Sequence, residues 1–236
     1  MDQEPGNMSQ RKPRRCPVCG LAKVARILWG LFPPTAAQFK ALDEGSVVLG
    51  GCCIPHHAPS WLCTGCGAQI YPEELRESNG RWYFAYGSNL HIEQKASRTG
   101  AIRASVRCRL PGHRFAFNKR AASGGGVYAN VIPDRSATVW GAAYLCNQAA
   151  IAALDRYEGV SGGHYRHQAV EVVTDGGKVL QAITYVAGDE FICPAGRPRA
   201  DYLHTILAGA RDHELPWEYI GFVDRLGGGL QEEEDE

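Results

Sequence analysis

The chain has 236 residues, with 25 basic and 25 acidic side chains and therefore a formal net charge of zero. Hydrophobic residues make up 44% of it and charged residues 21%, which excludes a disordered or fibrous protein. The balanced charge also argues against binding to nucleic acid or membrane by bulk charge. No apolar run approaches the ~20 residues that span a bilayer. Residues 1–15 are polar and basic, unlike a secretory signal, so we expect a cytoplasmic location.

Two matched cysteine motifs stand out in the first part of the chain, each with the pattern Cys-x-x-Cys-Gly. Two residues between the cysteines let both thiolates face one tetrahedral ion, and the following glycine permits a tight turn. Four thiolates would fill the coordination sphere of zinc, which is typical of a structural site. The spacing therefore predicts a zinc-ribbon-like domain over residues 1–78, with zinc held by Cys16, Cys19, Cys63 and Cys66.

Alternatives to this zinc site stay open. The four cysteines could simply be reduced thiols, and other residues could join the site, although packing or surface roles are simpler for them: Cys52, Cys53, His56 and His57. Between the two motifs we expect a helix near residues 35–44 and a strand near 46–49. A basic arm covers residues 11–15. Residues 1–80 carry eight basic and seven acidic side chains, so nucleic-acid binding is not expected.

A polar, turn-rich stretch at residues 71–80 predicts a linker, followed by a second domain over residues 79–236. This domain should contain short strands, glycine turns and two helical stretches. Residues 82–86 predict a buried strand that runs into a loop, Gly87-Ser88-Asn89-Leu90. A short helix should follow from about residue 89 to 96, with Ser88 or Asn89 as its N-cap. Such a loop directs several N–H groups to one place, which suits a carboxylate or oxyanion, but it is also a common structural turn.

The sequence of this loop resembles a known family motif. Residues 83–90, Tyr-Phe-Ala-Tyr-Gly-Ser-Asn-Leu, resemble the motif of the gamma-glutamylcyclotransferase family. Further segments resemble the family in the same order, at residues 139–141, 154–160, 163–165, 183–186, 201–202 and 215–219. The resemblance covers about residues 81–226 and implies an α+β fold built on a small, mixed, barrel-like sheet. It does not extend to the zinc-ribbon-like part.

Glu158 is the candidate proton carrier. A helix is predicted to start after Asn147 and to end at Gly159. Ile151 and Leu154 mark its apolar face, and Glu158 lies on the same face at seven and four residues' distance. Burial there should raise the pKa of its carboxyl group toward neutrality. A glutamate at a helix end can also turn to solvent, but the resemblance implies that Glu158 is the family's catalytic glutamate.

The resemblance implies an enzyme that cyclises the gamma-glutamyl group of a gamma-glutamyl amino acid or amine to 5-oxoproline. Glu158 would be the general acid and base, and no organic cofactor is required. The implied substrate-binding residues are Tyr86, Gly87, Ser88, Asn89, Leu90, Tyr165 and Tyr202. Tyr185 and Tyr219 should be structural. Three histidines are further candidates for acid–base chemistry, although packing or surface roles are simpler: His113, His164 and His167. The remaining thiols should be inert, at Cys108, Cys146 and Cys193.

Other functions stay open. The chain could be a non-catalytic binding protein that uses the zinc module to dock a partner, or an enzyme of another gamma-glutamyl transfer or hydrolysis. An enzyme requires Glu158 inside a closed pocket facing the loop of residues 86–90, whereas a binding protein could turn Glu158 away or fill the pocket with side chains. The expected partner is a small gamma-glutamyl compound whose leaving group is open: an amino acid, an amine, glutathione or a carrier-bound group. Residues 188–200 should contribute to the pocket wall.

Overall fold

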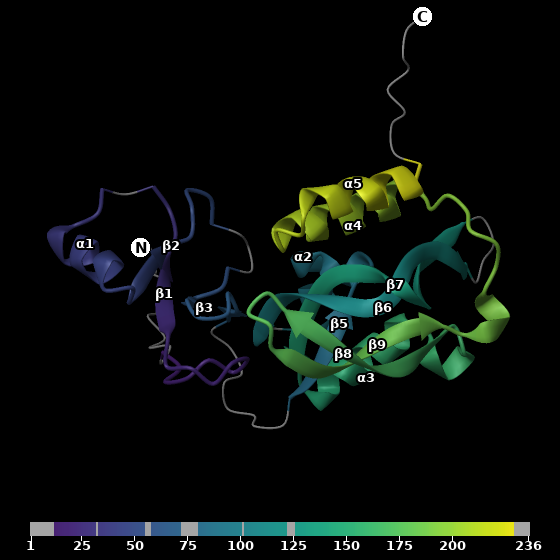
Figure 1. Ribbon diagram of the computed structural model, residues 1–236, viewed down its shortest axis with the longest axis horizontal. Helices are drawn as coiled ribbons and strands as arrows, with labels where there is room; N and C mark the ends of the chain where they lie inside the picture. Colours follow the sequence, from purple (N-terminus) through teal and green to yellow (C-terminus); the bar gives the residue numbers. More distant parts are fainter. Residues whose placement is uncertain are drawn as a thin grey trace, which may run out of the picture.

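The computed structural model describes residues 12–31, 33–54, 58–71, 80–100, 102–121 and 126–228. An N-terminal module lies beside a larger barrel, as Figure 1 shows. Most of the predicted linker, His56, His57 and Arg11 of the basic arm lie outside the described residues. None of the helices in the described ranges is long and apolar enough to cross a bilayer.

The module is a small sheet with one helix. Its four strands are β1 (Val24–Leu28), β2 (Val47–Leu49), β3 (Trp61–Cys63) and β4 (Gln69–Ile70). Strand β1 pairs in parallel with β2 and antiparallel with β3. Helix α1 (Ala36–Asp43) begins at Thr35 with a reciprocal capping box to Gln38 and ends at Glu44, as its sequence predicts. The expected strand at 46–49 corresponds to β2.

The second part is α+β, with a closed mixed barrel of five strands, as predicted. The strands are β5 (Arg81–Ala85), β6 (Ala104–Arg120), β7 (Val127–Cys146), β8 (Tyr165–Thr174) and β9 (Val179–Ala187). Their order is β6-β7-β5-β9-β8, and pairing of β8 with β6 closes the ring. Strands β5 and β9 are parallel, and the other neighbours are antiparallel.

The expectation of short strands and two helical stretches in this part is wrong. Strands β6 and β7 have 17 and 20 residues, and they bend around the barrel through two register shifts, at Pro111/His113 and Phe117/Lys119. The described residues of this part form four α-helices: α2 (Ile92–Thr99), α3 (Gln148–Tyr157), α4 (Ala200–Asp212) and α5 (Trp217–Leu226). Short local patterns do not reveal how far a hairpin extends, because its length is set by pairing with distant strands.

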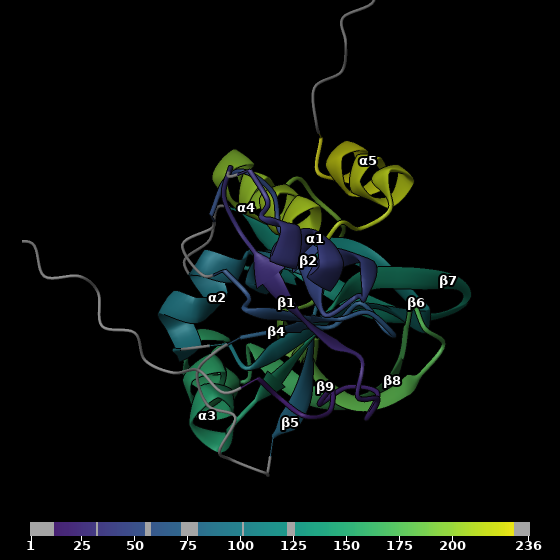
Figure 2. The same cartoon turned by 90° about the vertical axis from the view of Figure 1, so that its left-hand side faces the viewer.

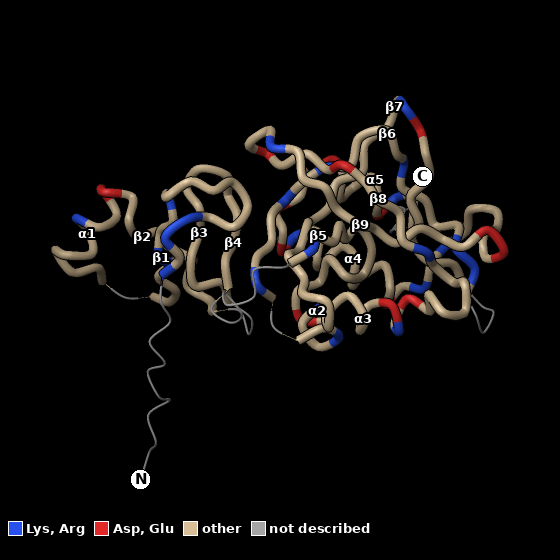
Figure 3. The backbone as a smooth tube through the Cα atoms, turned by 90° about the horizontal axis from the view of Figure 1, so that it is seen from below, with Lys and Arg blue, Asp and Glu red and all other residues tan. Residues whose placement is uncertain are grey.

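The helices cover the outside of the barrel. Helices α4 and α5 lie on one side and α3 on the opposite side, with α2 between them in the end-on view (Figures 1 and 2). Basic and acidic residues are interspersed along the described chain (Figure 3). Three short 3-10 turns complete the fold: Ser88–Leu90, Val160–Gly162 and Asp189–Phe191.

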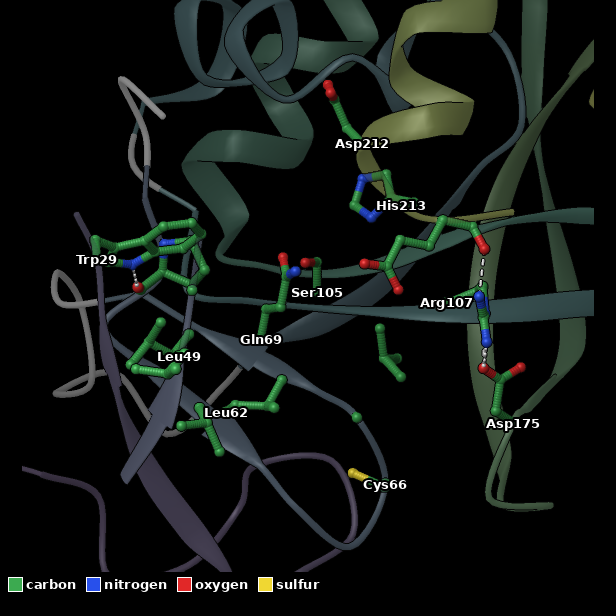
Figure 4. A pocket seen from close by; sticks show the side chains of 17 residues that line it. Trp29, Leu49, Leu62, Cys66, Gln69, Ser105, Arg107, Asp175, Asp212 and His213 are labelled. Atoms are coloured by element: carbon green, nitrogen blue, oxygen red, sulfur yellow. Dashed lines mark hydrogen bonds and ion pairs between the residues drawn. The ribbon is translucent and has the colours of Figure 1, made fainter. Parts of the chain in front are cut away.

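The module continues the barrel's sheet, because β4 pairs with the start of β6. A cavity of about 340 Å³ lies at this junction, with Trp29, Leu49 and Leu62 of the module on one side (Figure 4). On the other side Arg107 donates to Asp175 at 2.6 Å and to the carbonyl of Glu214. This guanidinium therefore links β6 to the β8–β9 turn and to the segment after α4.

Candidate active site

Glu158 is held at the end of α3 by local signals that its sequence contains. The side chain of Asn147 accepts from Ala150 N–H at 2.8 Å and caps the start of the helix. At the other end Gly159 adopts φ 64°, a left-handed conformation that favours glycine. A Cβ on Gly159 would also approach His164 to 3.1 Å. Asp155 accepts from Tyr185 OH and pairs with His167 Nε2, both at 2.6 Å, which ties α3 to β9 and β8.

Asn89 connects the glycine loop to Glu158. Its amide nitrogen donates to Glu158 Oε1 at 2.8 Å and to the Tyr83 hydroxyl at 2.9 Å. Its amide oxygen accepts from Arg98 Nη1 at 2.7 Å. The four side chains therefore form one partly buried hydrogen-bonded network, in which both N–H groups of the Asn89 amide donate and its oxygen accepts.

The same contacts explain why the predicted helix start is wrong. The chain forms a 3-10 turn at Ser88–Leu90, and α2 starts only at Ile92 with His91 as its N-cap. His91 Nδ1 accepts from Gln94 N–H at 3.3 Å. Asn89 cannot cap the helix because its side chain points inward to Glu158, a partner 69 residues away that local sequence does not reveal.

Two adjoining cavities meet at Glu158. An outer cavity of about 600 Å³ and an inner one of about 30 Å³ share four lining residues: Ser88, Glu158, Tyr165 and Tyr202. The inner cavity is also lined by Tyr86, Gly87 and Asn89. Of residues 188–200, Arg199 lines the outer one. The structure thus brings Glu158 and the glycine loop together, as an enzyme requires, but the pocket is open to solvent and not closed as expected.

The tyrosine hydroxyls around this pocket are fixed by the backbone. Tyr165 donates to the carbonyl of Ala129 at 2.9 Å, and Tyr202 accepts from the N–H of the same residue at 3.2 Å. Tyr86 donates to the carbonyl of Tyr185 at 2.6 Å. Burial raises the pKa of Tyr86, Tyr165 and Tyr202, so all three stay neutral near pH 7.

The glycine loop has backbone N–H groups that are available as hydrogen-bond donors. Within the described residues, the N–H groups of Gly87, Ser88 and Asn89 make no hydrogen bond to the protein. Leu90 lies elsewhere: its N–H donates to Gly87 O at 2.9 Å, its side chain is buried in the core, and it lines neither cavity. Its carbonyl accepts from Tyr144 OH at 2.9 Å, which holds the end of the loop.

Burial raises the pKa of the Glu158 carboxyl group above its usual value, as the helix position predicts. The hydrogen bond from Asn89 and the charges of Arg98 and Lys119 act in the opposite direction. Desolvation is the largest effect. A carboxyl group with a raised pKa can exchange protons near neutral pH.

Several residues that line the two cavities were not predicted from the sequence. Lys119 on β6 and Arg98 on α2 both line the outer cavity, and Tyr185, expected to be purely structural, lines the inner one. Neither cation belongs to a recognisable motif. Five residues in succession, 115–119, are buried and break the alternation of a strand, a feature that the structure reveals and the sequence does not. Tyr219, the other expected structural tyrosine, lines neither cavity.

Of the three candidate histidines, His164 alone reaches the pocket. It lines the outer cavity, and its Nδ1 lies 3.1 Å from Lys119 Nζ. Burial, followed by the charge of Lys119, lowers its pKa. His167 pairs with Asp155, and His113 contacts the Pro111 carbonyl and Gln168 outside the pocket. Among the remaining thiols, burial raises the pKa of Cys108.

The four cysteines of the two motifs form a cluster in the module. All four sulfurs lie within 4.8 Å of one another, with 3.7 Å between Cys16 and Cys66 and 3.5 Å between Cys19 and Cys63. Tetrahedral zinc with Zn–S of ~2.3 Å separates its sulfurs by ~3.8 Å, so the spacing fits that ion. Cys52 and Cys53 are exposed and lie outside this cluster in the described chain.

The two motifs share one turn geometry. In each, the glycine N–H donates to the carbonyl of the first cysteine, at 2.9 Å for Gly20 and 2.8 Å for Gly67. Both glycines have left-handed φ, of 76° and 71°. The N–H of Val18 donates to the sulfur of Cys16 at 3.3 Å, the arrangement expected around a thiolate ligand.

Comparison with known proteins matches the larger part of the chain. Residues 138–223 match the AIG2-like family. The chain is 32% identical to the gamma-glutamylcyclotransferase of Bos taurus over 154 residues, which cover 62% of this chain and 80% of that protein. It is 30% identical to the gamma-glutamylcyclotransferase of Homo sapiens over 160 residues, covering 66% and 81% of the two chains.

Solved structures share the fold. A gamma-glutamyl cyclotransferase superposes with a TM-score of 0.58 at 25% identity, covering 67% of this chain and 93% of the other. YkqA of Bacillus subtilis gives a TM-score of 0.56 at 26% identity, covering 65% and 56%. In each of the four comparisons with a single relative or structure, about a third of this chain has no counterpart.

Proposed function

The chain belongs to the gamma-glutamylcyclotransferase family, and we propose that it converts the gamma-glutamyl group of a gamma-glutamyl amino acid or amine into 5-oxoproline. The observation that carries the proposal is the contact between Glu158 and Asn89 at the meeting point of the two cavities. This contact supports the proposal because Glu158, the candidate acid and base, lies beside the loop whose N–H groups lack partners in the described structure.

The reaction needs little beyond positioning and proton transfer. The substrate's α-amine is tethered to its own γ-carbonyl carbon, so folding the substrate brings the nucleophile to its target. Glu158 takes a proton from the α-ammonium, and the nitrogen then attacks the carbonyl carbon. The resulting oxyanion is stabilised by the N–H groups of Gly87, Ser88 and Asn89. Glu158 returns the proton to the amide nitrogen as the C–N bond breaks. The ring nitrogen still carries one proton too many and loses it through Glu158 to the released amine, so the products are 5-oxoproline and the amine in its ammonium form.

Asn89 and the tyrosines support these steps. The Asn89 amide holds the Glu158 carboxylate toward the loop at 2.8 Å. Tyr86, Tyr165 and Tyr202 line the inner cavity, and their neutral rings exclude water around the reacting atoms. The raised pKa of Glu158 suits both directions of proton transfer.

We also propose that Cys16, Cys19, Cys63 and Cys66 hold one structural zinc in a module of residues 1–78, joined to a catalytic domain of residues 79–236. The sulfur spacing, the paired turns and the burial of Cys16, Cys63 and Cys66 support zinc. Four thiolates leave no open position, so the zinc would stabilise the module and the β4–β6 contact with the barrel.

The test is release of 5-oxoproline from a panel of gamma-glutamyl compounds, with the wild type compared with Glu158→Gln. Glutamine keeps the shape and can still accept from Asn89, but it cannot carry the proton. We expect release by the wild type and a loss of about 10²- to 10⁴-fold in the variant. Glu171→Gln is the matched control, because Glu171 is an exposed glutamate that also accepts from an amide, Gln181, at 2.7 Å.

Each outcome decides between the alternatives. Equal release by the wild type and Glu158→Gln would exclude Glu158 as the base. Binding of gamma-glutamyl compounds without any 5-oxoproline would favour the non-catalytic binding protein. Release of glutamate in place of 5-oxoproline would indicate hydrolysis on the same fold.

A further inference from the structure

The junction cavity, which lies between the module and the barrel at the β4–β6 contact, has no part in the proposed reaction. None of the described residues that line it also lines either cavity at Glu158. Its volume of about 340 Å³ is sufficient for a small molecule, and ligand sites are common where two domains meet. Its two walls differ in chemical character, and this difference indicates the class of molecule that fits.

The module wall is apolar and holds an indole ring in place. Trp29, Leu49 and Leu62 line the cavity from this side (Figure 4). The indole N–H of Trp29 donates to the carbonyl of Pro59 at 2.9 Å. The backbone of Gly50 packs against the ring, since a Cβ there would lie 2.5 Å from Trp29 Cδ2. The wall therefore offers apolar surface together with the aromatic ring that attracts cations most strongly.

The barrel wall carries an excess of negative charge. Among the described residues that line it, the one arginine or lysine is Arg107, which is already paired with Asp175 at 2.6 Å. Asp212 and Glu214 bring two further carboxylates to this wall, and no basic nitrogen of the described chain lies within 4.0 Å of either. A cation in the cavity would supply the counter-charge that the wall lacks.

The backbone holds Glu214 in a conformation that few non-glycine residues adopt. Its φ is 50°, the one positive value among the non-glycine residues of the described chain. Its N–H donates to the carbonyl of Arg211 at 2.9 Å, and its own carbonyl accepts from Arg107. These two hydrogen bonds keep a carboxylate residue at the cavity where glycine would adopt the backbone more easily, and strain of this kind is frequent at binding sites.

A buried hydroxyl group between the two walls lacks a partner. Ser105 lines the cavity (Figure 4) and pairs with Gln69 across the β4–β6 contact. It is 1% exposed, and its Oγ makes no hydrogen bond within the described residues. The nearby hydroxyl of Tyr71 donates to Gln69 Oε1 at 3.1 Å instead. Buried polar groups without partners are rare, and a donor on a bound molecule would satisfy this one.

The acidic wall also holds the glycine loop of the candidate active site. His213 lines the junction cavity, and its ring contacts the hydroxyl of Tyr144, which donates to the carbonyl of Leu90. The preceding residue, Asp212, accepts from the N–H of Ile92 at the start of α2. The end of α4 thus contacts the junction cavity on one side and the last residues of the loop on the other.

We propose that the junction cavity binds a small organic cation with an apolar group, of the alkylammonium or arylalkylammonium class, and that its occupancy alters the glycine loop. The apolar group packs against Trp29 and Leu62 of the module, and the ammonium group faces Glu214. The charge of Asp212 adds to the attraction. A bound molecule would therefore connect the module to the barrel and press on the end of α4.

The probe is phenethylammonium, and its binding to the whole chain is measured by isothermal titration calorimetry. Two matched compounds separate the two requirements. In 2-phenylethanol a hydroxyl replaces the ammonium group, and methylammonium lacks the apolar group. We expect one phenethylammonium ion per chain, and an affinity at least about 10-fold weaker for each matched compound, because each loses either the charged hydrogen bond or the buried ring.

Three variants assign the binding to this cavity. Glu214→Gln removes the charge but keeps the shape, and it should weaken phenethylammonium by roughly 10-fold while 2-phenylethanol binds as before. Trp29→Ala should weaken both compounds. Glu218→Gln, at an exposed position of α5 outside the cavity, should keep the wild-type affinities. Thermal unfolding shows whether each variant is folded, and if Trp29→Ala is not, Glu214→Gln decides.

The proposed site is refuted if phenethylammonium does not bind the wild type or if 2-phenylethanol binds equally well. It is also refuted if Glu214→Gln keeps the wild-type affinity for phenethylammonium, because the ion then binds elsewhere. Calorimetry decides these points without reference to any enzymatic activity.

The effect on the loop is measured as kcat/KM for 5-oxoproline release, and this readout alone rests on the proposed function. At a phenethylammonium concentration near its Kd, we expect a change of at least about twofold in the wild type, and its near-complete loss in Glu214→Gln. An unchanged kcat/KM, or an equal change in Glu214→Gln, would refute the coupling to the loop. If the wild type releases no 5-oxoproline, the proposed function fails, whereas the calorimetry still decides the site.

Discussion

The buried histidine behind the glycine loop should make the protein unusually sensitive to mild acid. His213 ends α4, is 6% exposed, and lies with Nε2 2.5 Å from the hydroxyl oxygen of Tyr144. Because that hydroxyl donates to the carbonyl of Leu90, its oxygen accepts from the Nε2–H of His213. Protonation of the ring would place a charge in a closed site at the end of the loop.

The direction and size of the pH effect on stability follow from the pKa of His213 in the folded and in the unfolded protein. Burial lowers the pKa of His213 from 6.5 to about 4 in the folded protein. Between these two values the unfolded chain binds a proton that the folded chain does not, so stability falls as the pH falls. The free energy of unfolding falls by about 1.4 kcal/mol per pH unit in this range, so lowering the pH from 6.5 to 4.5 should destabilise the protein by roughly 2 to 3 kcal/mol.

The assay is urea unfolding at several pH values between 7.5 and 4.5, for the wild type and His213→Gln. The variant should be less stable at pH 7.5, because it loses a packed ring, but its stability should depend less steeply on pH. The difference between the slopes isolates His213, since acid effects on the cysteine cluster are common to both proteins. His204→Gln, an exposed position on the same helix, should keep the wild-type slope. Parallel curves for the wild type and His213→Gln would refute the reasoning.

Two further predictions concern the module and the helix packing. The change Cys63→Ser should abolish binding of one zinc per chain and lower the thermal midpoint, and removal of the metal by a chelator should lower it likewise. Cys193→Ser, outside the cluster, should retain the metal. The zinc-to-protein ratio measures metal content, and thermal unfolding curves measure the midpoint. Retention of one zinc by Cys63→Ser would contradict the four-cysteine site. Gly209→Ala should destabilise the protein by roughly 1 to 3 kcal/mol, because the added Cβ would lie 2.2 Å from His91 N, although alanine is intrinsically the better helix former. Gly221→Ala in α5 meets only the flexible end of Arg225 at 3.3 Å and should be neutral or stabilising, and equal free energies of unfolding for the two variants would exclude the close contact.

Much of the local structure could be predicted from sequence because its causes lie within a few residues. Thr35 and Gln38 define the start of α1, and Asn147 and Gly159 define the two ends of α3. The helical spacing from Leu154 places Glu158 on the buried face. The two cysteine motifs predict their own turns and, as a pair, their cluster. The barrel followed from resemblance in the motifs rather than from any local pattern.

Apart from Glu158 and its loop, the residues that line the pocket could be identified only from the tertiary structure. The Asn89 side chain turns inward because Glu158, Tyr83 and Arg98 converge on it, and this moves the start of α2 to Ile92. Lys119 reaches the pocket because a register shift in the long hairpin rotates it inward. The pairing of β4 with β6 joins module and barrel in one sheet.

These features share one physical reason. Caps, turns and helical faces depend on hydrogen bonds and side-chain spacing within about four residues, so the sequence determines them directly. The direction of a buried amide or ammonium group depends on partners brought near by strand pairing. The sequence by itself therefore determined the two cysteine motifs, the helix that carries Glu158 and the loop that faces it. Closure of the barrel decided that Asn89 contacts the Glu158 carboxylate and that the charges of Arg98 and Lys119 lower the pKa of the same group.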